Sequence, residues 1–332
     1  MKNKNHNNPR VAIVIVTWNN ADIISECLKS ISSQTYKMHT TTIIDNGSQD
    51  NTVGLIKKSF PWVNLIESKD NLGFAKGNNE AINQILMNDL DVDYVVLLNS
   101  DASLDKEWLR HHIEFAKNKP NGGIFQGTTL DYYDSKVIDS THIYISRNGQ
   151  GIQANWRKLY IGEKGPMKIF GTNAAACMIS RKFIDEQPFK NQLFDERFFM
   201  YLEDVDLAAR ALVLGWDNYL VPAARAYHMG SASSGKNPGF SLYMTYRNNA
   251  ALLMKNIPAP VLLRMVPSII RADFHTVRHL YREKKYSSMW KVIQGRFVGI
   301  LRLPLYLRKT WLIKRSTTIP KDYLWHFMDR GC

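Results

Sequence analysis

Residues 11–20 read VAIVIVTWNN, an unbroken apolar run that gives way to polar side chains at Thr17. A continuous run of this length is typical of a parallel strand that is covered on both faces. Three further strand patterns follow at 41–44, 63–66 and 94–98, and helical patterns separate them at 24–31, 53–58 and 75–87. Strands that alternate with helices at this spacing predict an α/β fold with a mostly parallel sheet.

Three of the expected strands end in polar clusters, which are Thr17-Trp18-Asn19, Asp45-Asn46-Gly47 and Asn99-Ser100-Asp101. In open α/β sheets, ligands bind beyond the carboxyl ends of the strands. Any strand can end in a polar turn, so one cluster alone indicates little. Three clusters at one edge favour a single site built from all of them.

Acidic residues near these ends are candidates for metal binding and for acid–base chemistry. The oxygens of Asp101 suit Mg²⁺ or Mn²⁺ bound together with phosphates, although Asp is an equally good cap for a helix over 102–110. Glu203 and Asp204 begin a helical run, where the helix dipole favours their ionised forms. Either could act as a general base, or both could be an ordinary charged helix start.

Two further motifs are candidates for binding. His228, in AYHMGS at 226–231, belongs to a residue type that often binds metals, although a single histidine is more often structural. The segment NLGFAKGNN, 71–79, precedes a helix, and its glycines would let backbone amides approach a diphosphate. It has neither the GKS or GKT of a P-loop nor a GxGxxG pattern.

The formal net charge of +13 is concentrated at the end of the chain. From Lys255 onward, 16 Lys and Arg stand against 4 Asp and Glu, a net +12, which leaves 27 against 26 for the rest, a net +1. Such an extension favours an anionic partner. Three cysteines without a CxxC pair predict neither a zinc site nor a disulfide framework, and they fit a reducing compartment.

The basic extension has two stripes at helical spacing, an apolar one of Ile270, Phe274, Val277 and Tyr281 and a cationic one of Arg271, His275, Arg278 and Arg282. A second helix is expected around 290–300. These patterns favour a helix that lies on an anionic membrane surface, with ordinary packing on the domain as the alternative. No nucleic-acid partner is expected, because no nucleic-acid motif accompanies the charge. No apolar run reaches the roughly 18 residues of a spanning helix.

Seven motifs occur in order along the chain: VAIVIVTWNN (11–20), IIDNGSQDNT (43–52), NLGFAKGNN (71–79), LLNSDA (97–102), GTNAAACMISR (171–181), FDERFFMYLEDVDLAAR (194–210) and AYHMGSAS (226–233). Together they resemble glycosyltransferase family 2, with the GT-A fold, and especially its rhamnosyltransferase-like members. They cover most of residues 10–250. The resemblance implies a Rossmann-like mixed sheet that binds a nucleotide sugar.

The resemblance also implies roles for single residues. Thr17, Asn19 and Asp45 would contact the nucleobase and ribose, and the Asn71–Asn79 segment, with Gly73, would line the nucleotide pocket. Asp101 stands at the last acid of the family's D-x-D metal motif, Asn99 replaces its first acid, and His228 would complete the metal shell. Asp204 resembles the catalytic base, and Glu203 could exchange roles with it. The Gly171–Ala175 segment would lie near the donor sugar and the acceptor.

The function that the resemblance implies is an inverting, metal-dependent transfer with Mg²⁺ or Mn²⁺. The first expectation is rhamnose from dTDP-rhamnose, moved to a glycan or polyprenyl-linked oligosaccharide in cell-surface polysaccharide synthesis. The Q-x-x-R-W motif of processive synthases is absent, so one or a few sugars would be added. A sugar nucleotidyltransferase and a non-catalytic, nucleotide-sugar-binding membrane scaffold are the alternatives.

The expected organisation has three parts. Residues 1–10, MKNKNHNNPR, imitate the basic leader of a signal peptide, but no small-residue cleavage site follows the apolar run. The run at 11–17 is therefore expected to be a buried first strand. The ten residues before it are expected to be disordered. A GT-A domain would occupy 11–255. A basic helical extension, 256–332, would hold the protein in the cytoplasm on the inner face of the cell membrane.

Overall fold

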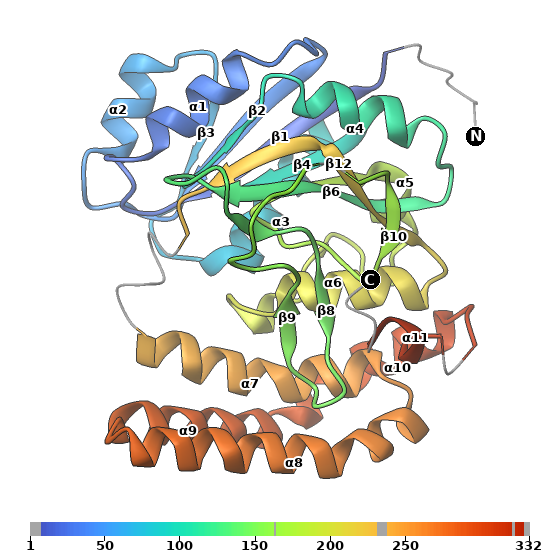
Figure 1. The fold of residues 1–332 in the computed structure, drawn as a ribbon. Helices are drawn as coiled ribbons and strands as arrows, with labels where there is room; N and C mark the ends of the chain where they lie inside the picture. The colour runs from blue at the N-terminus through green and yellow to red at the C-terminus, as the bar shows by residue number, and fades with distance from the viewer. Residues whose placement is uncertain (1–7, 163, 231–237, 321–322, 329–332) are drawn as a thin grey trace.

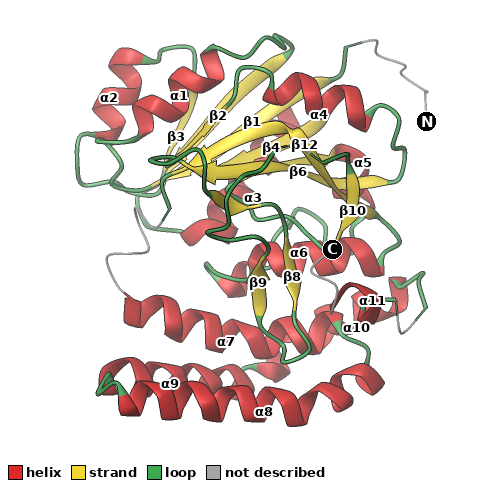
Figure 2. Cartoon of the chain, in the orientation of Figure 1, coloured by secondary structure: helices red, strands yellow, loops and turns green. Residues whose placement is uncertain are grey.

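The computed structural model describes residues 8–162, 164–230, 238–320 and 323–328, and it shows a central sheet covered by helices, with further helices layered below (Figures 1 and 2). In this part of the chain, ten strands form one sheet with the order β10-β12-β6-β11-β4-β1-β2-β3, in which β5 also pairs with β12 and β7 with β6. The first strands are β1 (Arg10–Thr17), β2 (His39–Asp45), β3 (Asn64–Glu67), β4 (Val92–Leu98) and β5 (Ala102–Leu104). The remaining strands of the sheet are β6 (Gly122–Asp131), β7 (Ile138–Ser140), β10 (Met167–Ile169), β11 (Ala176–Ser180) and β12 (Asp217–His228).

Helices cover both faces of the sheet and form the lower layer. They are α1 (Ile24–Ser32), α2 (Thr52–Ser59), α3 (Gly73–Asn88), α4 (Trp108–Ala116), α5 (Arg181–Glu186), α6 (Glu203–Val213), α7 (Pro238–Asn256), α8 (Ala259–Arg282), α9 (Tyr286–Leu301), α10 (Leu307–Ser316) and α11 (Trp325–Met328). Two 3-10 turns, η1 (Glu196–Phe198) and η2 (Leu303–Tyr306), and a hairpin of β8 (Ile143–Ile145) and β9 (Gly151–Gln153) complete the described elements.

The sheet is mixed rather than wholly parallel. β1 pairs in parallel with β2 and β4, and β2 pairs in parallel with β3. β11 then runs antiparallel between β4 and β6, and β12 is parallel to β6. The predicted α/β class and GT-A mixed sheet are therefore confirmed. The antiparallel β11 also brings the 171–175 segment to the carboxyl end of β4.

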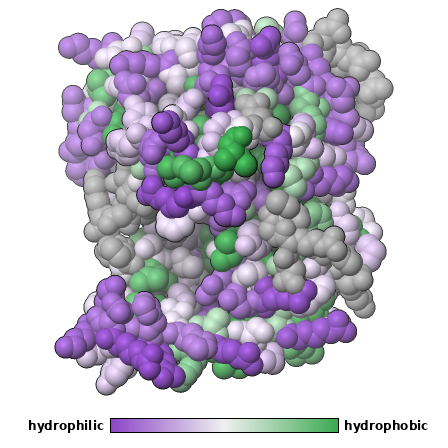
Figure 3. All heavy atoms as spheres, in the orientation of Figure 1, coloured by the Kyte–Doolittle hydropathy of each residue, from purple (hydrophilic) through white to green (hydrophobic). Residues whose placement is uncertain are grey.

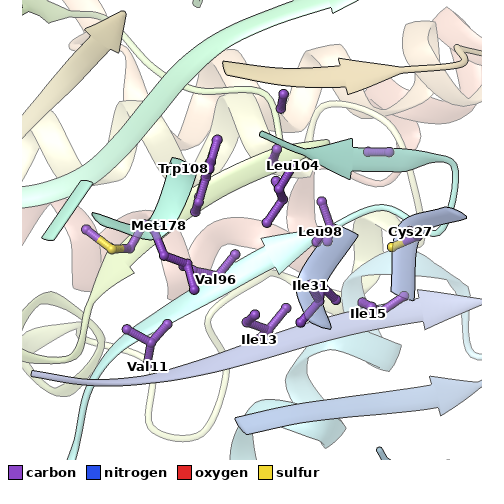
Figure 4. Packing of buried hydrophobic residues seen from close by; sticks show 14 of the residues in the cluster. Val11, Ile13, Ile15, Cys27, Ile31, Val96, Leu98, Leu104, Trp108 and Met178 are labelled. Atoms are coloured by element: carbon purple, nitrogen blue, oxygen red, sulfur yellow. The ribbon is translucent and has the colours of Figure 1, made fainter. Parts of the chain in front are cut away.

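The core explains why β1 is apolar throughout. Val11, Ile13 and Ile15 face one side of the sheet and pack with residues of α1 and α4 (Figure 4). Ala12 and Val14 face the other side, in a cluster with residues of α3, α5 and α6. Successive strand residues point to opposite faces, so a strand covered on both faces has no polar alternation.

A third apolar cluster joins α6 to the C-terminal helices. Val205 and Ala208 of α6 belong to the same cluster as Leu252 of α7, Met265 of α8 and Ile313 of α10. Residues of the expected 256–332 extension therefore share a core with the helix that begins at Glu203. None of the helices in the described ranges has the length and apolar composition needed to cross a bilayer.

Several expectations from the sequence can be compared with these elements. The four predicted strands and three predicted helices of the first hundred residues are all present. Asp101 does not cap a helix, because β5 follows it and α4 begins only at Trp108, with Glu107 at its N-cap. Of the expected disordered decapeptide, residues 1–7 lie outside the described ranges, whereas Arg10 begins β1 and its backbone N–H donates to Asp93 Oδ2 at 2.8 Å.

Candidate active site

The carboxyl ends of β1, β2 and β4 lie side by side. Thr17 and Asp45, the last residues of β1 and β2, are register partners. Asn20 Oδ1 accepts hydrogen bonds from the hydroxyls of Thr17 and Ser100, at 3.2 and 3.0 Å. The polar residues after β1 and β4 thus form one connected network at the edge where a ligand would bind.

The turn after β2 is tied to the turn after β1. The carboxylate of Asp45 accepts hydrogen bonds from the backbone N–H groups of Gly47 and Ser48, at 3.1 and 2.9 Å. Asn19 has a positive φ of 53°, its N–H donates to Ser48 Oγ at 2.8 Å, and its Oδ1 accepts from Gln49 N at 2.7 Å. These bonds hold Asn19 and Asp45 in one rigid rim.

The 71–79 segment contacts the loop before α6. Gly73 has a φ of 74°, and a Cβ there would lie 2.5 Å from the ring of Phe199, so only glycine fits. Its N–H donates to Asn71 Oδ1 at 2.9 Å. Asn79 is 1% exposed, and its side-chain amide makes two hydrogen bonds with the backbone of Phe194. It donates to the carbonyl of Phe194 at 3.0 Å and accepts from its N–H at 2.9 Å. Asn79 therefore braces the loop that leads into η1 and α6.

Asp101 and His228 meet across the β5–β12 pair. Ala102 and His228 are register partners, and Met229 N–H donates to Asp101 O at 2.9 Å. His228 Nε2 lies 3.3 Å from Asp101 Oδ1, and its Nδ1 lies 3.0 Å from Asp139 Oδ2. Burial lowers the pKa of His228, but hydrogen bonds to Asp101 and Asp139, with their charges, outweigh burial and raise the pKa to about 10.

The Asp101–His228 pair fits a divalent cation that shares its shell with a substrate. Two ligands on adjacent corners of an octahedron with bonds of 2.0–2.1 Å lie about 3 Å apart, close to the 3.3 Å between these two atoms. Carboxylate and imidazole are both common ligands for such ions. Among the described residues no three His, Cys, Asp or Glu are grouped to hold an ion alone, so phosphates or water would have to supply the other ligands.

Two neighbouring carboxyl groups begin α6, as the sequence predicted. Glu203 is 7% exposed, and its Oε2 has no hydrogen-bond partner among the residues that the structure describes. Burial, and then the charge of Asp204, raise the pKa of Glu203 well above its usual value. Burial also raises the pKa of Asp204, to about 6, against hydrogen bonds from the backbone of Val205 and Ala174. Burial therefore favours the protonated form of both carboxyl groups.

The loop that leads into α6 has an unusual backbone. Phe199, Tyr201 and Leu202 all have φ between 63° and 68°, a region that non-glycine residues rarely occupy and that marks functional sites. The amide of Asn248, on α7, donates to the carbonyls of Phe198, Met200 and Tyr201 at 3.0, 2.9 and 2.8 Å. These bonds stabilise the loop in the conformation that presents Asp204.

The segment 171–175 connects the start of α6 to the carboxyl end of β4. Asn99 N–H donates to Ala175 O at 2.9 Å, and the backbone of Ala174 hydrogen-bonds Asp204. Both polar side-chain atoms of Asn173 are buried and lack partners within the described ranges. The strand end that bears Asn99 and the helix start that bears Asp204 therefore face one region of the fold.

A buried ion cluster lies beneath α6. Lys255 is fully buried, and its Nζ lies 2.9 Å from both Asp195 Oδ2 and Asp206 Oδ2. Lys309 Nζ contacts Asp195 Oδ1 at 2.8 Å, and Arg210 lies 3.7 Å from Asp206. The cluster joins α6 to α7 and α10 through charge, as the third apolar cluster does through packing.

Sequence reasoning missed three of these participants. Asp139 is a single acid in a weakly patterned stretch, and Asn248 is one polar residue within a long helix, so neither has a local signal. Lys255 was counted only as part of a cationic extension. The one hint in the sequence is that Asn248 and Lys255 stand close to the apolar run AALLM, in RNNAALLMK at 247–255. Polar residues that are mixed into an apolar helix are candidates for burial with a partner.

The sequence profile described as glycosyl transferase family 2 matches residues 12–187, about half of the chain. An N-acetylglucosaminyl-diphospho-decaprenol L-rhamnosyltransferase from Mycobacterium tuberculosis is 25% identical over 305 residues, which are 86% of this chain and 98% of that protein. A poly-beta-1,6-N-acetyl-D-glucosamine synthase from Staphylococcus aureus is 30% identical over 133 residues, 39% of this chain and 30% of that protein.

Solved structures with the same fold include two proteins of low sequence identity to this chain. A mannosyltransferase from Pyrobaculum calidifontis, in complex with GDP-Man and Mn²⁺, has a TM-score of 0.54 and 15% identity, over 89% of this chain and 87% of that one. Residues 1–349 of S. aureus TarS, in complex with UDP, also have a TM-score of 0.54, with 16% identity over 96% of this chain and 92% of that one.

Proposed function

We propose that this chain, which belongs to glycosyl transferase family 2 and uses a nucleotide-sugar donor, transfers one sugar with inversion in a single displacement. Asp204 would take the proton of the acceptor hydroxyl while that oxygen attacks the anomeric carbon opposite the leaving nucleoside diphosphate. The observation that carries the proposal is the carboxyl pair at the start of α6, in which burial and the charge of Asp204 raise the pKa of Glu203 well above its usual value, and burial raises the pKa of Asp204 to about 6.

Asp204 suits the role of base better than its neighbour. A base must be ionised at the working pH and open to the acceptor. Asp204 is half-buried, whereas Glu203 is buried, and burial together with the charge of Asp204 raises the pKa of Glu203 and so favours its neutral form. Glu203 would then keep the pair at one negative charge, and it need not take part in proton transfer.

The rim formed by the ends of β1, β2 and β4 would bind the donor. Thr17, Asn19 and Asp45 would contact the nucleobase and ribose, and Asn99 would lie beside the diphosphate. Asn71 and Gly73 would border the same pocket. Asn79 would act indirectly, because its amide is used to hold Phe194.

Asp101 and His228 would hold Mg²⁺ or Mn²⁺. Such a cation, when bound, offsets the charge that develops on the leaving diphosphate. The Pyrobaculum mannosyltransferase contains Mn²⁺, which supports this assignment by its likeness of fold. Asn99 stands in place of a second acid, so we expect the donor phosphates to supply much of the affinity.

We expect rhamnose, from dTDP-rhamnose, as the sugar, and a polyprenyl-linked oligosaccharide or glycan of a cell-surface polysaccharide as the acceptor. Support comes from the mycobacterial relative, an L-rhamnosyltransferase that acts on an N-acetylglucosaminyl-diphospho-decaprenol acceptor. The two sequences are 25% identical, and on this basis we choose dTDP-rhamnose as the first donor to test.

The test is a donor panel with the full chain, Mn²⁺ or Mg²⁺, and a lipid extract as acceptor. We expect release of dTDP from dTDP-rhamnose, loss of release with EDTA, and a product whose anomeric configuration is opposite to that of the donor. Retention of configuration would refute the single displacement. In a parallel reaction with a nucleoside triphosphate and a sugar 1-phosphate, release of pyrophosphate would indicate a nucleotidyltransferase. Nucleotide binding without release from any donor would indicate a scaffold.

A membrane surface is the expected location of this reaction. Exposed apolar residues form one stripe along α8 and another along α9, which pack side by side at the lower edge of the molecule (Figure 1). They are Leu263, Val266, Ile270, Phe274 and Tyr281 on α8 and Trp290, Ile293, Phe297 and Ile300 on α9, each at least 38% exposed. We call these nine residues the α8–α9 face.

Cations surround the α8–α9 face. Arg264, Arg271, Arg278 and Arg282 are exposed along α8, and Lys284 and Lys285 are exposed in the turn to α9. Hydrophilic side chains gather around that turn, at the lower left of Figure 3. Apolar residues beside arginines are typical of helices that lie in the interface of an anionic bilayer, where each cation adds about 1 kcal/mol.

The double substitution Phe274→Ser/Phe297→Ser is expected to weaken binding to vesicles of phosphatidylglycerol and phosphatidylcholine by about tenfold or more, because a buried Phe contributes roughly 1.5–3 kcal/mol. Co-sedimentation of the full chain measures this. Met87→Ser/Leu90→Ser is the matched control, since both residues are more than 70% exposed but lie at the α3–β4 turn. Wild-type protein that stays in the supernatant at low salt would refute membrane docking.

A further inference from the structure

We propose that Asp139 is a positioning residue that aims the imidazole of His228 at the cation site shared with Asp101. The inference rests on the proposed metal role of Asp101 and His228. Asp139 belongs to none of the sequence motifs, and it lies 89 residues before His228 along the chain.

The topology places Asp139 and His228 on opposite sides of one strand. β6 pairs with β12 on one side, and near its carboxyl end it pairs with β7 on the other. Asp139 is the central residue of β7, and His228 ends β12. The two side chains therefore meet across β6, at the edge of the sheet where Asp101 also lies.

The three side chains form one line of contacts. Asp139 Oδ2 lies 3.0 Å from His228 Nδ1, and Asp101 Oδ1 lies 3.3 Å from His228 Nε2. All three are largely buried, with side chains only 15%, 13% and 10% exposed for Asp139, His228 and Asp101. Because Nδ1 is held by one carboxylate, the ring is left with Nε2 facing the other.

A carboxylate on the far nitrogen is the usual support of a metal-binding histidine. The hydrogen bond fixes the orientation of the ring, selects which nitrogen is left for the ion, and makes that nitrogen a stronger donor. Removal of such a support typically costs about 10–100-fold in metal affinity. A merely structural Asp139 would change the stability of the fold and leave Mn²⁺ affinity unaltered.

The test is Mn²⁺ affinity of the full chain, measured by the electron paramagnetic resonance signal of free Mn²⁺ with dTDP present. We expect Asp139→Ala to weaken Mn²⁺ binding by roughly 10–100-fold. Asp139→Asn should restore part of the loss, because an amide oxygen still accepts the Nδ1–H bond. Asp134→Ala, an exposed acid before the same strand, is the control and should bind Mn²⁺ like wild type.

A double-mutant cycle separates positioning from a general effect. If Asp139 acts through His228, the double variant Asp139→Ala/His228→Ala should bind Mn²⁺ no more weakly than His228→Ala alone. Thermal unfolding without metal checks that each variant is folded. If Asp139→Ala is not folded, Asp139→Asn takes its place in the cycle.

Unchanged Mn²⁺ affinity in Asp139→Ala, or losses that add in the double variant, would overturn the proposal. A wild-type chain that binds no Mn²⁺ would overturn both this proposal and the metal role of Asp101 and His228. Loss of Mn²⁺ binding in Asp139→Ala together with no sugar transfer by wild type would leave the inference intact and refute the proposed function.

Discussion

Asp204→Asn is expected to lower kcat by about 10²–10⁴-fold, because an amide cannot accept the proton of the acceptor hydroxyl. In the proposed site the donor binds at the strand ends, away from Asp204, so its affinity should change little. Single-turnover transfer from dTDP-rhamnose measures the chemical step, and titration with dTDP measures binding. A loss of dTDP affinity that matched the loss of kcat would show that the residue binds the donor instead.

Glu203→Gln is the matched control for this variant. The raised pKa of Glu203 favours its neutral form, and a neutral amide of the same length should replace it with the loss of at most one hydrogen bond, worth about 1 kcal/mol or less than tenfold in rate. The reverse result, with Glu203→Gln inactive and Asp204→Asn active, would exchange the roles of the two carboxyl groups.

The pH dependence follows from the same pair. The active form carries a deprotonated Asp204, whose pKa burial raises to about 6. kcat/KM of the wild type should therefore be constant above that pH and fall tenfold per pH unit below it. Glu203→Gln should keep this acid limb, because the neutral Glu203 contributes no charge that the substitution would remove.

Lys255→Met is expected to lower the free energy of unfolding by about 3–5 kcal/mol, because it removes one partner from a buried ion cluster. Methionine keeps the apolar stem but leaves Asp195 and Asp206 without the ammonium group at 2.9 Å from each. Each aspartate keeps a second partner in the variant, because Lys309 contacts Asp195 and Asn256 donates to Asp206 Oδ1 at 2.7 Å. We therefore expect a loss near the lower end of this range.

Urea denaturation at neutral pH measures this loss, and Lys58→Met, at an exposed position of α2, is the control. A loss below about 1 kcal/mol, the value of an exposed pair, would contradict the role of the cluster. If Lys255 also holds α6 in place, transfer activity of the folded variant should fall. The cluster would then position the helix that bears Asp204.

Acid should reduce the difference between wild type and Lys255→Met. Burial alone would raise the pKa of Asp195, but the charges of Lys255 and Lys309 hold it well below its usual value. A depressed folded-state pKa contributes stability that is present above the unfolded-state pKa, about 3.9, and is lost as pH falls below it. Lowering the pH through about 4 should therefore destabilise the wild type more than the variant.

Local patterns predicted the elements of the first hundred residues well. The apolar run of β1 and the helical spacing in α1 depend only on neighbours in sequence, and the polar ends at Thr17, Asp45 and Asn99 follow from where those strands stop. The prediction of carboxyl groups at a helix start was likewise local, and α6 begins at Glu203.

Relations between distant segments could not be read in this way. The weakly patterned 137–145 stretch contains β7, whose Asp139 reaches His228 only because β6 lies between them. The motif that contains Gly73 and Asn79 was expected to line the pocket. In the structure Asn79 also hydrogen-bonds the backbone of Phe194, and the ring of Phe199 lies against Gly73. Asn248 supports the loop before α6 from 47 residues away.

The amino-acid sequence alone therefore determined the α/β class, the family motifs, the edge of the sheet that bears the polar residues and the carboxyl pair of α6, because each is set by spacing within a few residues. Tertiary structure decided how the pKa of each of the two carboxyl groups is shifted, which histidine nitrogen faces Asp101, and whether Lys255 is a surface charge or a buried one. Those outcomes depend on burial and on partners that the fold brings together from distant parts of the chain, and a pKa or a metal site responds to that surrounding rather than to the neighbours in sequence.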